Sequence, residues 1–374
     1  MAGGSGTRIL IVDDSVVMRS LLRSVIGVDA GLEVAGSASD GESALRAIET
    51  LHPDLVLLDV EMPVMDGLAT LRELRARGHK MPVIMCSSLT QRGARVTIEA
   101  LAGGASDYVA KPVGQPGREE AIQALAQDLL PKIRALTGQQ KSQAAVSGAA
   151  RMAFPLPIAP HRAQPVTANP AVLAIGVSTG GPAALDVLLP ALPAGFPLPV
   201  VVVQHMPELF TRIFAERLDG RCGLRVREAA EGDPVRAGTV YIARGNWHME
   251  VLAAAGAGSP NTLHLNQDPE ENHCRPAVDA LFRSVAGVYG AGVLAVVLTG
   301  MGSDGLAGCR LIRDQGGSVL VQDQATSAVW GMPGAVAHAG LANRVLPLGG
   351  IAPEILRMAG RAHGEARDLH KVVN

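Results

Sequence analysis

The sequence has few aromatic residues and almost no net charge. Only 3% of its 374 residues are aromatic, while 48% are hydrophobic, so aliphatic side chains must fill its cores. Cores of that kind are typical of parallel sheets covered on both faces. The net charge of −2 offers no strongly basic surface, and we therefore expect no binding of nucleic acid.

Long apolar runs and paired cysteines are also missing. No run approaches the roughly 20 residues that span a bilayer, so we expect no direct membrane insertion. Residues 1–7 lack the cationic and apolar regions of a secretory signal. The cysteines form no C-x-x-C pair, which argues against a zinc knuckle or a dithiol motif; they are Cys86, Cys222, Cys274 and Cys309. Scattered free cysteines fit a reducing compartment, and we expect a cytoplasmic location.

Short apolar runs alternate with amphipathic stretches in the first third of the chain. The expected strands are residues 9–12, 32–35, 55–58, 83–86 and 108–110, and helical patterns lie between them. A repeated strand–helix unit predicts an α/β fold whose doubly wound parallel sheet carries helices on both faces. We assign this first domain to residues 8–130.

A linker and a second domain are expected to follow. Residues 131–168 are rich in Ala, Gln, Ser and Pro, which fits either a disordered tether or a segment that docks a partner. Strong buried strands at 172–177, 199–203 and 292–298 predict a second parallel α/β sheet over residues 169–359. Shorter, more polar strands between 225 and 267 predict an antiparallel insertion. The polar tail, 360–374, is assigned no role.

Four charged residues follow strands of the first predicted sheet. Asp13 and Asp14 come after the first strand, Asp59 after the third and Lys111 after the fifth. The carboxyl ends of parallel strands meet at one edge, so these side chains are expected to converge. Converging carboxylates call for a cation, and hard oxygen ligands suit Mg²⁺. Taken singly, Asp13 and Asp14 could also be helix N-caps.

Taken together, these motifs resemble the receiver domain of two-component response regulators over roughly residues 8–130. The matching segments are 13–14, 59–67, 85–88 and 108–112. The resemblance implies phosphorylation of Asp59 and a flavodoxin-like fold. It also implies that Asp14, Asp59 and the backbone carbonyl of Glu61 hold Mg²⁺, with Asp13 acting through water. The residues that would respond to the phosphoryl group are Ser87, Tyr108 and Lys111.

A serine, a histidine and an aspartate follow three strands of the second predicted sheet. Residues 176–180 match G-x-S-x-G, a sharp strand-to-helix turn that exposes Ser178 as a nucleophile. His205 follows the next strand and could act as general base. Asp304 follows a later strand and is placed to orient His205. A serine before a helix is often an N-cap. Three other histidines compete: His248 and His264 lie in the expected insertion strands and rank lower, while His273 could line a substrate cleft.

The glycines around Asp304 leave a rival interpretation open. Residues 300–305 match G-x-G-x-x-G, and Asp323 follows at about the spacing of a dinucleotide-binding unit. Two features count against it: Asp304 would put a carboxylate where a pyrophosphate should lie, and the motif falls on a late strand.

The second domain resembles the catalytic domain of chemotaxis protein-glutamate methylesterases over roughly residues 171–359. The segments that carry this resemblance are 176–182, 204–207, 275–282 and 298–305. It implies hydrolysis of γ-glutamyl methyl esters on the cytoplasmic domains of chemoreceptors, with release of methanol, and deamidation of glutamines as a second activity. The amide of Met301 is the candidate oxyanion donor, assisted by Thr179.

With a receiver in front, the same resemblance implies activation by phosphorylation, with a chemotaxis histidine kinase as phosphodonor. The esterase reaction itself is expected to need no cofactor. An alternative remains a phosphorylation-gated adaptor whose hydrolase domain is inactive, which labelling of Ser178 with a fluorophosphonate would distinguish.

Overall fold

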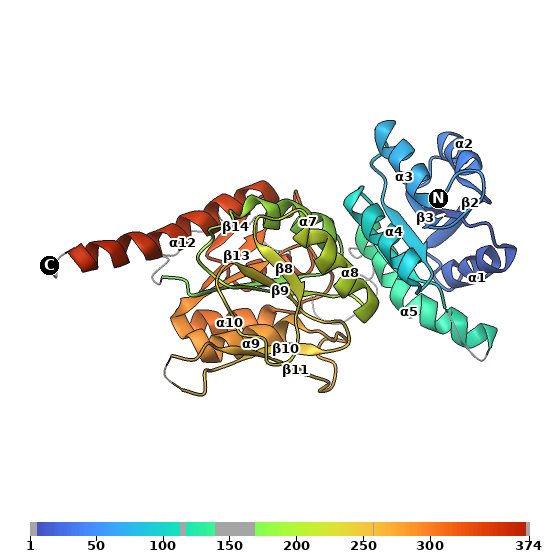
Figure 1. The fold of residues 1–374 in the computed structure, drawn as a ribbon. Helices are drawn as coiled ribbons and strands as arrows, with labels where there is room; N and C mark the ends of the chain where they lie inside the picture. Colours follow the sequence, from blue (N-terminus) through green and yellow to red (C-terminus); the bar gives the residue numbers. More distant parts are fainter. Residues whose placement is uncertain (1–5, 113–116, 139–168, 257, 372–374) are drawn as a thin grey trace, which may run out of the picture. The chain divides into compact units, whose positions relative to one another are not determined.

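The structure, a computed structural model, describes residues 6–112, 117–138, 169–256 and 258–371, with side chains described up to residue 360. The chain divides into two compact units, Met1–Met152 and Ala153–Asn374 (Figure 1). Residues 139–168, which include most of the predicted linker, lie outside the described residues.

The N-terminal unit is a five-stranded parallel sheet in the order β2-β1-β3-β4-β5. Its strands are β1 Thr7–Val12, β2 Leu32–Ala38, β3 Leu55–Asp59, β4 Val83–Ser87 and β5 Asp107–Ala110. Its helices are α1 Val16–Ile26, α2 Gly41–Leu51, α3 Gly67–Ala76, α4 Gln91–Ala102 and α5 Arg118–Thr137. The doubly wound parallel sheet predicted from the apolar runs is confirmed.

Helix α5 extends the first unit beyond the predicted boundary at residue 130. It contains Pro131, buries Ile133 in the core beneath β1 and β3, and ends before Gly138, whose φ of 74° closes the last turn. The first residues of the predicted linker are therefore helical. The shift to a polar, proline-rich composition comes after this helix.

The C-terminal unit is built on a seven-stranded sheet in the order β14-β13-β12-β6-β7-β9-β8, in which every described pairing is parallel. Its strands are β6 Val172–Val177, β7 Val200–Gln204, β8 Arg225–Glu228, β9 Thr239–Ile242, β12 Val293–Val297, β13 Ser318–Gln322 and β14 Arg344–Leu346. An antiparallel pair, β10 His248–Leu252 with β11 Thr262–Asn266, lies outside this sheet.

Six helices accompany the second sheet within the described residues. They are α7 Gly181–Leu188, α8 Glu208–Asp219, α9 Val278–Tyr289, α10 Leu306–Asp314, α11 Met332–His338 and α12 Leu348–Lys371, with short 3-10 turns at Leu189–Ala191 and Gly290–Gly292. Helix α12 continues through most of the segment predicted as a polar tail. In the part of the chain with described coordinates, no helix is both long and apolar enough to cross a bilayer.

The predicted antiparallel insertion is only half as large as expected. Strands β8 and β9 pair in parallel with each other and with β7, so they extend the main sheet. They looked like insertion strands because β8 is an edge strand with alternately exposed side chains, and an edge position needs fewer apolar residues. The turn at Gly245 and Asn246 accordingly links two different sheets and closes no hairpin.

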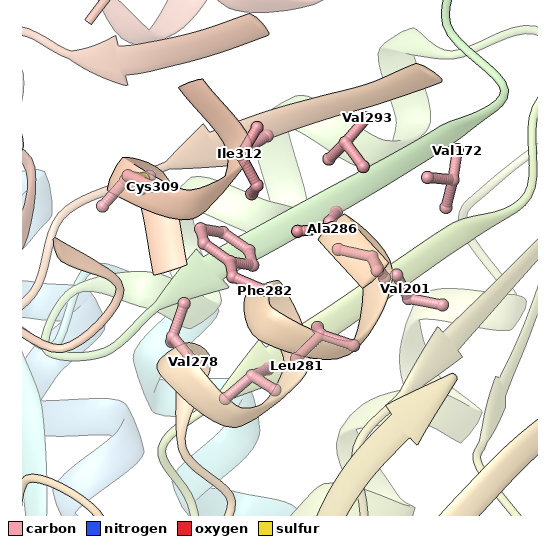
Figure 2. Close-up of a cluster of buried hydrophobic side chains, with 14 of the residues drawn as sticks. Val172, Val201, Val278, Leu281, Phe282, Ala286, Val293, Cys309 and Ile312 are labelled. Carbon is pink, nitrogen blue, oxygen red and sulfur yellow. The ribbon is translucent and has the colours of Figure 1, made fainter. Parts of the chain in front are cut away.

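The core of the second unit fixes helix α9 against the sheet (Figure 2). Phe282, which is fully buried, lies among side chains of α10 and the sheet; the surrounding cluster includes Val172, Val201, Val278, Leu281, Ala286, Val293, Cys309 and Ile312. Gly308 allows the two helices to approach, since a Cβ there would lie 2.3 Å from Cβ of Phe282. The first turns of α9 and α10 are therefore held together.

Candidate active site and acidic pocket

The predicted acidic pocket forms at the carboxyl edge of the first sheet. Strands β1 and β3 are neighbours, which places Asp13 beside Asp59. Carboxylate oxygens of Asp13, Asp14 and Asp59 lie within 4.8 Å of one another. The Lys111 ammonium is 2.8 Å from Oδ2 of Asp13 and 2.7 Å from Oδ1 of Asp59.

The charges of the pocket depend on one another. Burial raises the pKa of Asp59, and the hydrogen bond and charge of Lys111 oppose this only in part. Burial alone would lower the pKa of Lys111, but its bonds to Asp13 and Asp59 outweigh that effect and raise it, so the lysine stays charged. Three carboxylates, with exposed Asp14 at the mouth, form the all-oxygen donor set that suits Mg²⁺.

Glu61 and Ser87 flank the acidic pocket. The backbone N–H of Glu61 donates to the carboxylate of Asp59. The carbonyl of Glu61 therefore also lies near the pocket. Ser87 is fully buried, and its hydroxyl accepts from Thr97 of α4 at 2.8 Å and donates to the Ser88 carbonyl at 3.2 Å. In this structure, the Ser87 hydroxyl is therefore bonded to α4 and to its own loop.

Tyr108 lies in β5 with its ring buried. Nζ of Lys132 donates to the Tyr108 carbonyl at 2.7 Å and stands 5.3 Å from the ring centroid. Burial, with the nearby charge of Asp107, raises the pKa of the phenol well above its ordinary value, so the ring stays neutral.

Ser178 and His205 lie next to each other at the carboxyl edge of the second sheet. Val177 and Gln204 are paired in the register of β6 and β7, and the amide of His205 donates to the Val177 carbonyl at 3.2 Å. On the other side, the amide of Ser178 donates to the Thr299 carbonyl at 3.0 Å, at the end of the β12 segment. The three chain segments named from the sequence thus meet at one edge.

His205 and Asp304 are in direct contact. Nε2 of the imidazole is 2.8 Å from Oδ2 of Asp304, and Nδ1 is 3.5 Å from Sγ of Cys274. Since Asp304 occupies Nε2, Nδ1 is the nitrogen that does not contact Asp304, and in this structure it faces the Cys274 thiol. Among the described residues, no hydrogen bond yet joins the Ser178 hydroxyl to the ring, and such bonds often form only when substrate is bound.

The environment favours the ionised form of both partners. Burial lowers the pKa of His205, but hydrogen bonds with Asp304 and Cys274 outweigh it and raise the value to about 9. Burial would raise the pKa of Asp304, yet the His205 contact and the amides of Val278 and Asp279 together lower it. Asp304 is therefore a carboxylate well suited to stabilise an imidazolium.

The amides of Met301 and Thr179 lie on turns that flank Ser178. Gly300 packs directly on the nucleophile, since a Cβ there would lie 2.8 Å from Cβ of Ser178, and Met301 comes next. The Thr299 hydroxyl donates to the Thr179 carbonyl at 2.9 Å, which ties the two turns together. Within the described part of the chain, neither amide has a hydrogen-bond partner, so both remain able to donate to a substrate oxygen.

Three of the remaining candidates from the sequence have structural partners, whereas His273 is exposed at a φ of 61°. Buried His248 bonds to the Pro269 carbonyl and accepts from the Ala277 amide, while His264 pairs with Glu231. Asp323 accepts from the amide and hydroxyl of Thr326 in its own loop. The glycine-rich loop at 300–305 places the carboxylate of Asp304, not an open anion site, at the helix amides, which disfavours the dinucleotide interpretation.

One supporting residue was missed in the sequence. Gln204 is 2% exposed, and its Nε2 donates to the carbonyls of Ser178 at 3.0 Å and His205 at 3.2 Å. It therefore links the backbones of Ser178 and His205. The available signal was a polar residue that closes a run of four buried valines, Val200–Val203.

Comparisons with known proteins match both units. The model of the CheB methylesterase family matches residues 173–355, and that of the response regulator receiver domain matches residues 9–126. A protein-glutamate methylesterase/protein-glutamine glutaminase of Nocardioides sp. is 52% identical over 95% of this chain and 96% of its own length. A protein of the same name from Trichodesmium erythraeum is 48% identical over 94% and 99% of the two chains. The solved Thermotoga maritima CheB methylesterase catalytic domain is 41% identical, covering 51% of this chain and 100% of that one, with a TM-score of 0.49.

Proposed function

Because this chain belongs to the protein-glutamate methylesterase/protein-glutamine glutaminase family, we propose that it hydrolyses γ-glutamyl methyl esters of chemoreceptors and deamidates receptor glutamines. The receiver unit at the N-terminus adds control by phosphorylation. The substrates are the cytoplasmic domains of methylated receptors, the phosphodonor is a chemotaxis histidine kinase, and the enzyme acts in the cytoplasm. We assign the receiver to residues 8–137 and the catalytic domain to 169–359.

Hydrolysis proceeds through Ser178 as nucleophile. Neutral His205 takes the Ser178 proton at Nδ1 while Nε2 stays bonded to Asp304, which stabilises the resulting imidazolium. Attack on the ester carbonyl forms a tetrahedral intermediate, and the imidazolium then protonates departing methanol. Water, activated by the same imidazole, releases the glutamate carboxylate from the acyl-enzyme. On a glutamine, the same steps release ammonia.

The negative charge of the intermediate forms on the former carbonyl oxygen. The amides of Met301 and Thr179 flank Ser178 without partners in the described chain, and we assign them to this oxygen. Loss of one such donor typically lowers the rate by about 10²- to 10³-fold.

In the receiver unit, Asp59 is the phosphorylation site. Asp13, Asp14, Asp59 and the carbonyl of Glu61 would hold Mg²⁺, which supplies positive charge to offset the phosphoryl oxygens. Lys111 already contacts Asp59 at 2.7 Å and can bond to an oxygen of the phosphoryl group. For Ser87 to donate to the same group, its hydroxyl hydrogen must leave the Ser88 carbonyl. We propose that this exchange, with a response of Tyr108, carries the signal.

The contact between His205 and Asp304 is the observation that carries the esterase assignment. Ser178 lies beside it, because Ser178 and His205 each follow the last paired residues of β6 and β7. The direct test is methanol release from methylated receptor fragments. Replacing Ser178 by Ala should reduce the rate by about 10⁶-fold, and Asp304→Ala by about 10⁴-fold, as in other triads. A fluorophosphonate should label Ser178 in the native enzyme. A Ser178→Ala variant that releases methanol normally would refute the mechanism, and an unlabelled, inactive native protein would favour the adaptor.

A further inference from the structure

The carboxylate of Asp304 accepts hydrogen bonds from several backbone amides as well as contacting the imidazole of His205. Oδ2 accepts from the Val278 amide at 2.6 Å in addition to His205. Oδ1 accepts from the amides of Asp279 at 3.0 Å and Gly305 at 2.9 Å. Val278 and Asp279 begin helix α9, so Asp304 caps that helix with its side chain. Its orientation is thereby tied to the first turn of α9.

A second aspartate makes the reciprocal contact. Asp279, in the first turn of α9, accepts from the Gly308 amide in the first turn of α10 at 2.7 Å through Oδ1. Asp304 lies two residues before the first residue of α10 and caps α9. A carboxylate from α9 thus binds the N-terminus of α10, a carboxylate from the loop before α10 binds the N-terminus of α9, and both are buried at the junction. Burial, with a contribution from Asp304, raises the pKa of Asp279.

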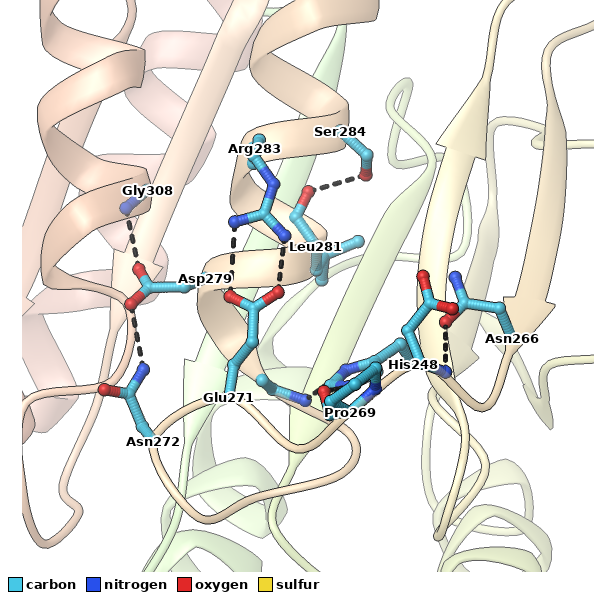
Figure 3. A network of polar contacts seen from close by, with 12 residues as sticks. His248, Asn266, Pro269, Glu271, Asn272, Asp279, Leu281, Arg283, Ser284 and Gly308 are labelled. Atoms are coloured by element: carbon cyan, nitrogen blue, oxygen red, sulfur yellow. Dashed lines mark hydrogen bonds and ion pairs between the residues drawn. The ribbon is translucent and has the colours of Figure 1, made fainter.

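Asn272 bridges these two carboxylates. Its Nδ2 lies 3.0 Å from Oδ1 of Asp304. It also lies 3.0 Å from Oδ2 of Asp279, and Figure 3 shows this second contact. An amide nitrogen carries two hydrogens, so it can donate one to each acceptor. A neutral double donor between two like charges reduces their repulsion without adding a cation that would compete with His205 for Asp304.

The turn that carries Asn272 is shaped for this contact. Asn272 and His273 have φ values of 54° and 61°, in the left-handed region that costs most residues energy and that asparagine tolerates best. Reciprocal backbone bonds between Glu271 and Cys274 close the turn, and Arg283 of α9 pairs with Glu271 at 2.6 Å (Figure 3). The same turn places the thiol of Cys274 at Nδ1 of the imidazole.

We propose that Asn272 is a positioning residue for the esterase reaction: its amide fixes the Asp304 carboxylate in the orientation that holds His205, by bridging it to Asp279. The residue is exposed at the surface of the junction, so it contributes little to the core and acts mainly on these two carboxylates. The inference rests on the proposed function, because it concerns the same His205–Asp304 pair.

Replacing Asn272 by Gly tests the role of the amide. Glycine adopts the left-handed conformation freely, so the turn is kept and only the two hydrogen bonds are lost. We expect kcat for methanol release to fall about tenfold with little change in KM, since the interaction matters in the transition state. The rate should also reach its plateau at a lower pH. Without the amide, Asp304 and Asp279 share a proton more readily, so Asp304 stabilises the His205 imidazolium less.

A double-mutant cycle with Asp304→Ala separates positioning from general damage. If Asn272 acts through Asp304, Asn272→Gly should cost less than about twofold in the Asp304→Ala background. Glu270→Gln, one residue before the same turn and with an exposed side chain, is the matched control and should keep kcat within about twofold. Asn272→Asp keeps the shape and tolerates the same φ while removing the donor, so it should lose at least as much activity.

The possible outcomes are distinct. Unchanged kcat and pH dependence in Asn272→Gly, or an equal cost with and without Asp304, would overturn the positioning role while leaving the proposed function intact. Absence of methanol release from the native enzyme would instead refute the proposed function, whereas full activity of Asp304→Ala would refute the role of Asp304 and with it the positioning role. If Asn272→Gly has a lower thermal midpoint of unfolding, kcat is compared at a temperature at which both proteins are fully folded.

Discussion

The imidazole of His205 is held from both sides, by Asp304 at Nε2 and by the Cys274 thiol at Nδ1. Burial disfavours a charged ring, whereas both contacts favour it, and the contacts prevail. At the scale of single residues, this balance decides the pH at which Ser178 can transfer its proton.

We therefore predict that kcat/KM for ester hydrolysis rises with pH up to about 9. His205 accepts a proton only when neutral, and its pKa is raised to about 9, so the rate falls as pH drops below that value. The same shift contributes stability that is fully present below the ordinary pKa of 6.5 and is lost as pH rises through about 9. Rates of methanol release measured over this range provide the test.

Asp304→Asn is the informative control for the pH profile. Removing the charge removes the main interaction that raises the pKa of His205, so the profile should shift to lower pH even as the rate falls. A profile that is flat in the native enzyme, or unmoved by Asp304→Asn, would show that another group governs the rate.

Sequence reasoning located the residues that lie at strand ends and missed those that hold them. Ser178, His205 and Asp304 each follow an apolar run, and parallel strands bring such positions to one edge. Asn272 has no such signal, because its turn is shaped by contacts with side chains distant in the sequence, such as Arg283. The side-chain contact of Gln204 with two backbones is equally invisible in a strand pattern.

At the scale of elements, the turn from β6 into α7 sets the nucleophile in place. Gly180 has a φ of 76°, which reverses the chain after Ser178. Gly181 lies so close to Gln204 that a Cβ there would fall 2.0 Å from its Oε1. Strand, turn and helix are thus locked together through a glutamine of the neighbouring strand.

Gly181→Ala is expected to lower esterase activity sharply. The new methyl group must displace Gln204, which loses its bonds to the carbonyls of Ser178 and His205. Crowding of this kind typically costs about 1–3 kcal/mol of stability. Methanol release and denaturant unfolding would be measured together. Gly195→Ala, where a Cβ would meet nothing within 4 Å, is the matched control and should behave as wild type.

Element pairing was less predictable than element position. The short, polar strand patterns between residues 225 and 267 include β8 and β9. Their direction in the sheet depends on the crossover that includes α8, which makes them parallel to β7. Their polarity instead suggested an antiparallel insertion. Polar residues indicate that one face of a strand is exposed to solvent. The edge strand of a parallel sheet and the strands of a hairpin can both have such a face, so polarity does not distinguish them.

At the scale of the whole molecule, a phosphate acceptor and an ester hydrolase lie on one chain, in separate compact units. The proposed control requires that the charge added at Asp59 change the equilibrium of the receiver and thereby the activity of the catalytic domain. A coupling free energy of about 1–3 kcal/mol, which is ordinary for allosteric proteins, would raise the rate by about 5- to 150-fold.

Replacing Asp59 by Asn should abolish stimulation by a small phosphodonor and leave the basal rate of methanol release in place. Asp59 is the acceptor in the proposed mechanism, and the substitution leaves Ser178, His205 and Asp304 unchanged. Chelation of Mg²⁺ should block phosphorylation of the native chain without reducing its basal esterase rate. Conversely, Ser178→Ala should still accept the phosphoryl group. Stimulation that persists in Asp59→Asn would place the acceptor elsewhere.

The contacts of Asp304 and Asp279 with the first turns of α9 and α10 can also be followed by hydrogen exchange of backbone amides. The amide hydrogens of Val278, Asp279 and Gly308 end on buried carboxylates, so deuterium can replace them only when the junction opens. Isotope uptake at these three positions would then report how firmly the catalytic carboxylate is held, in the resting enzyme and with no substrate present.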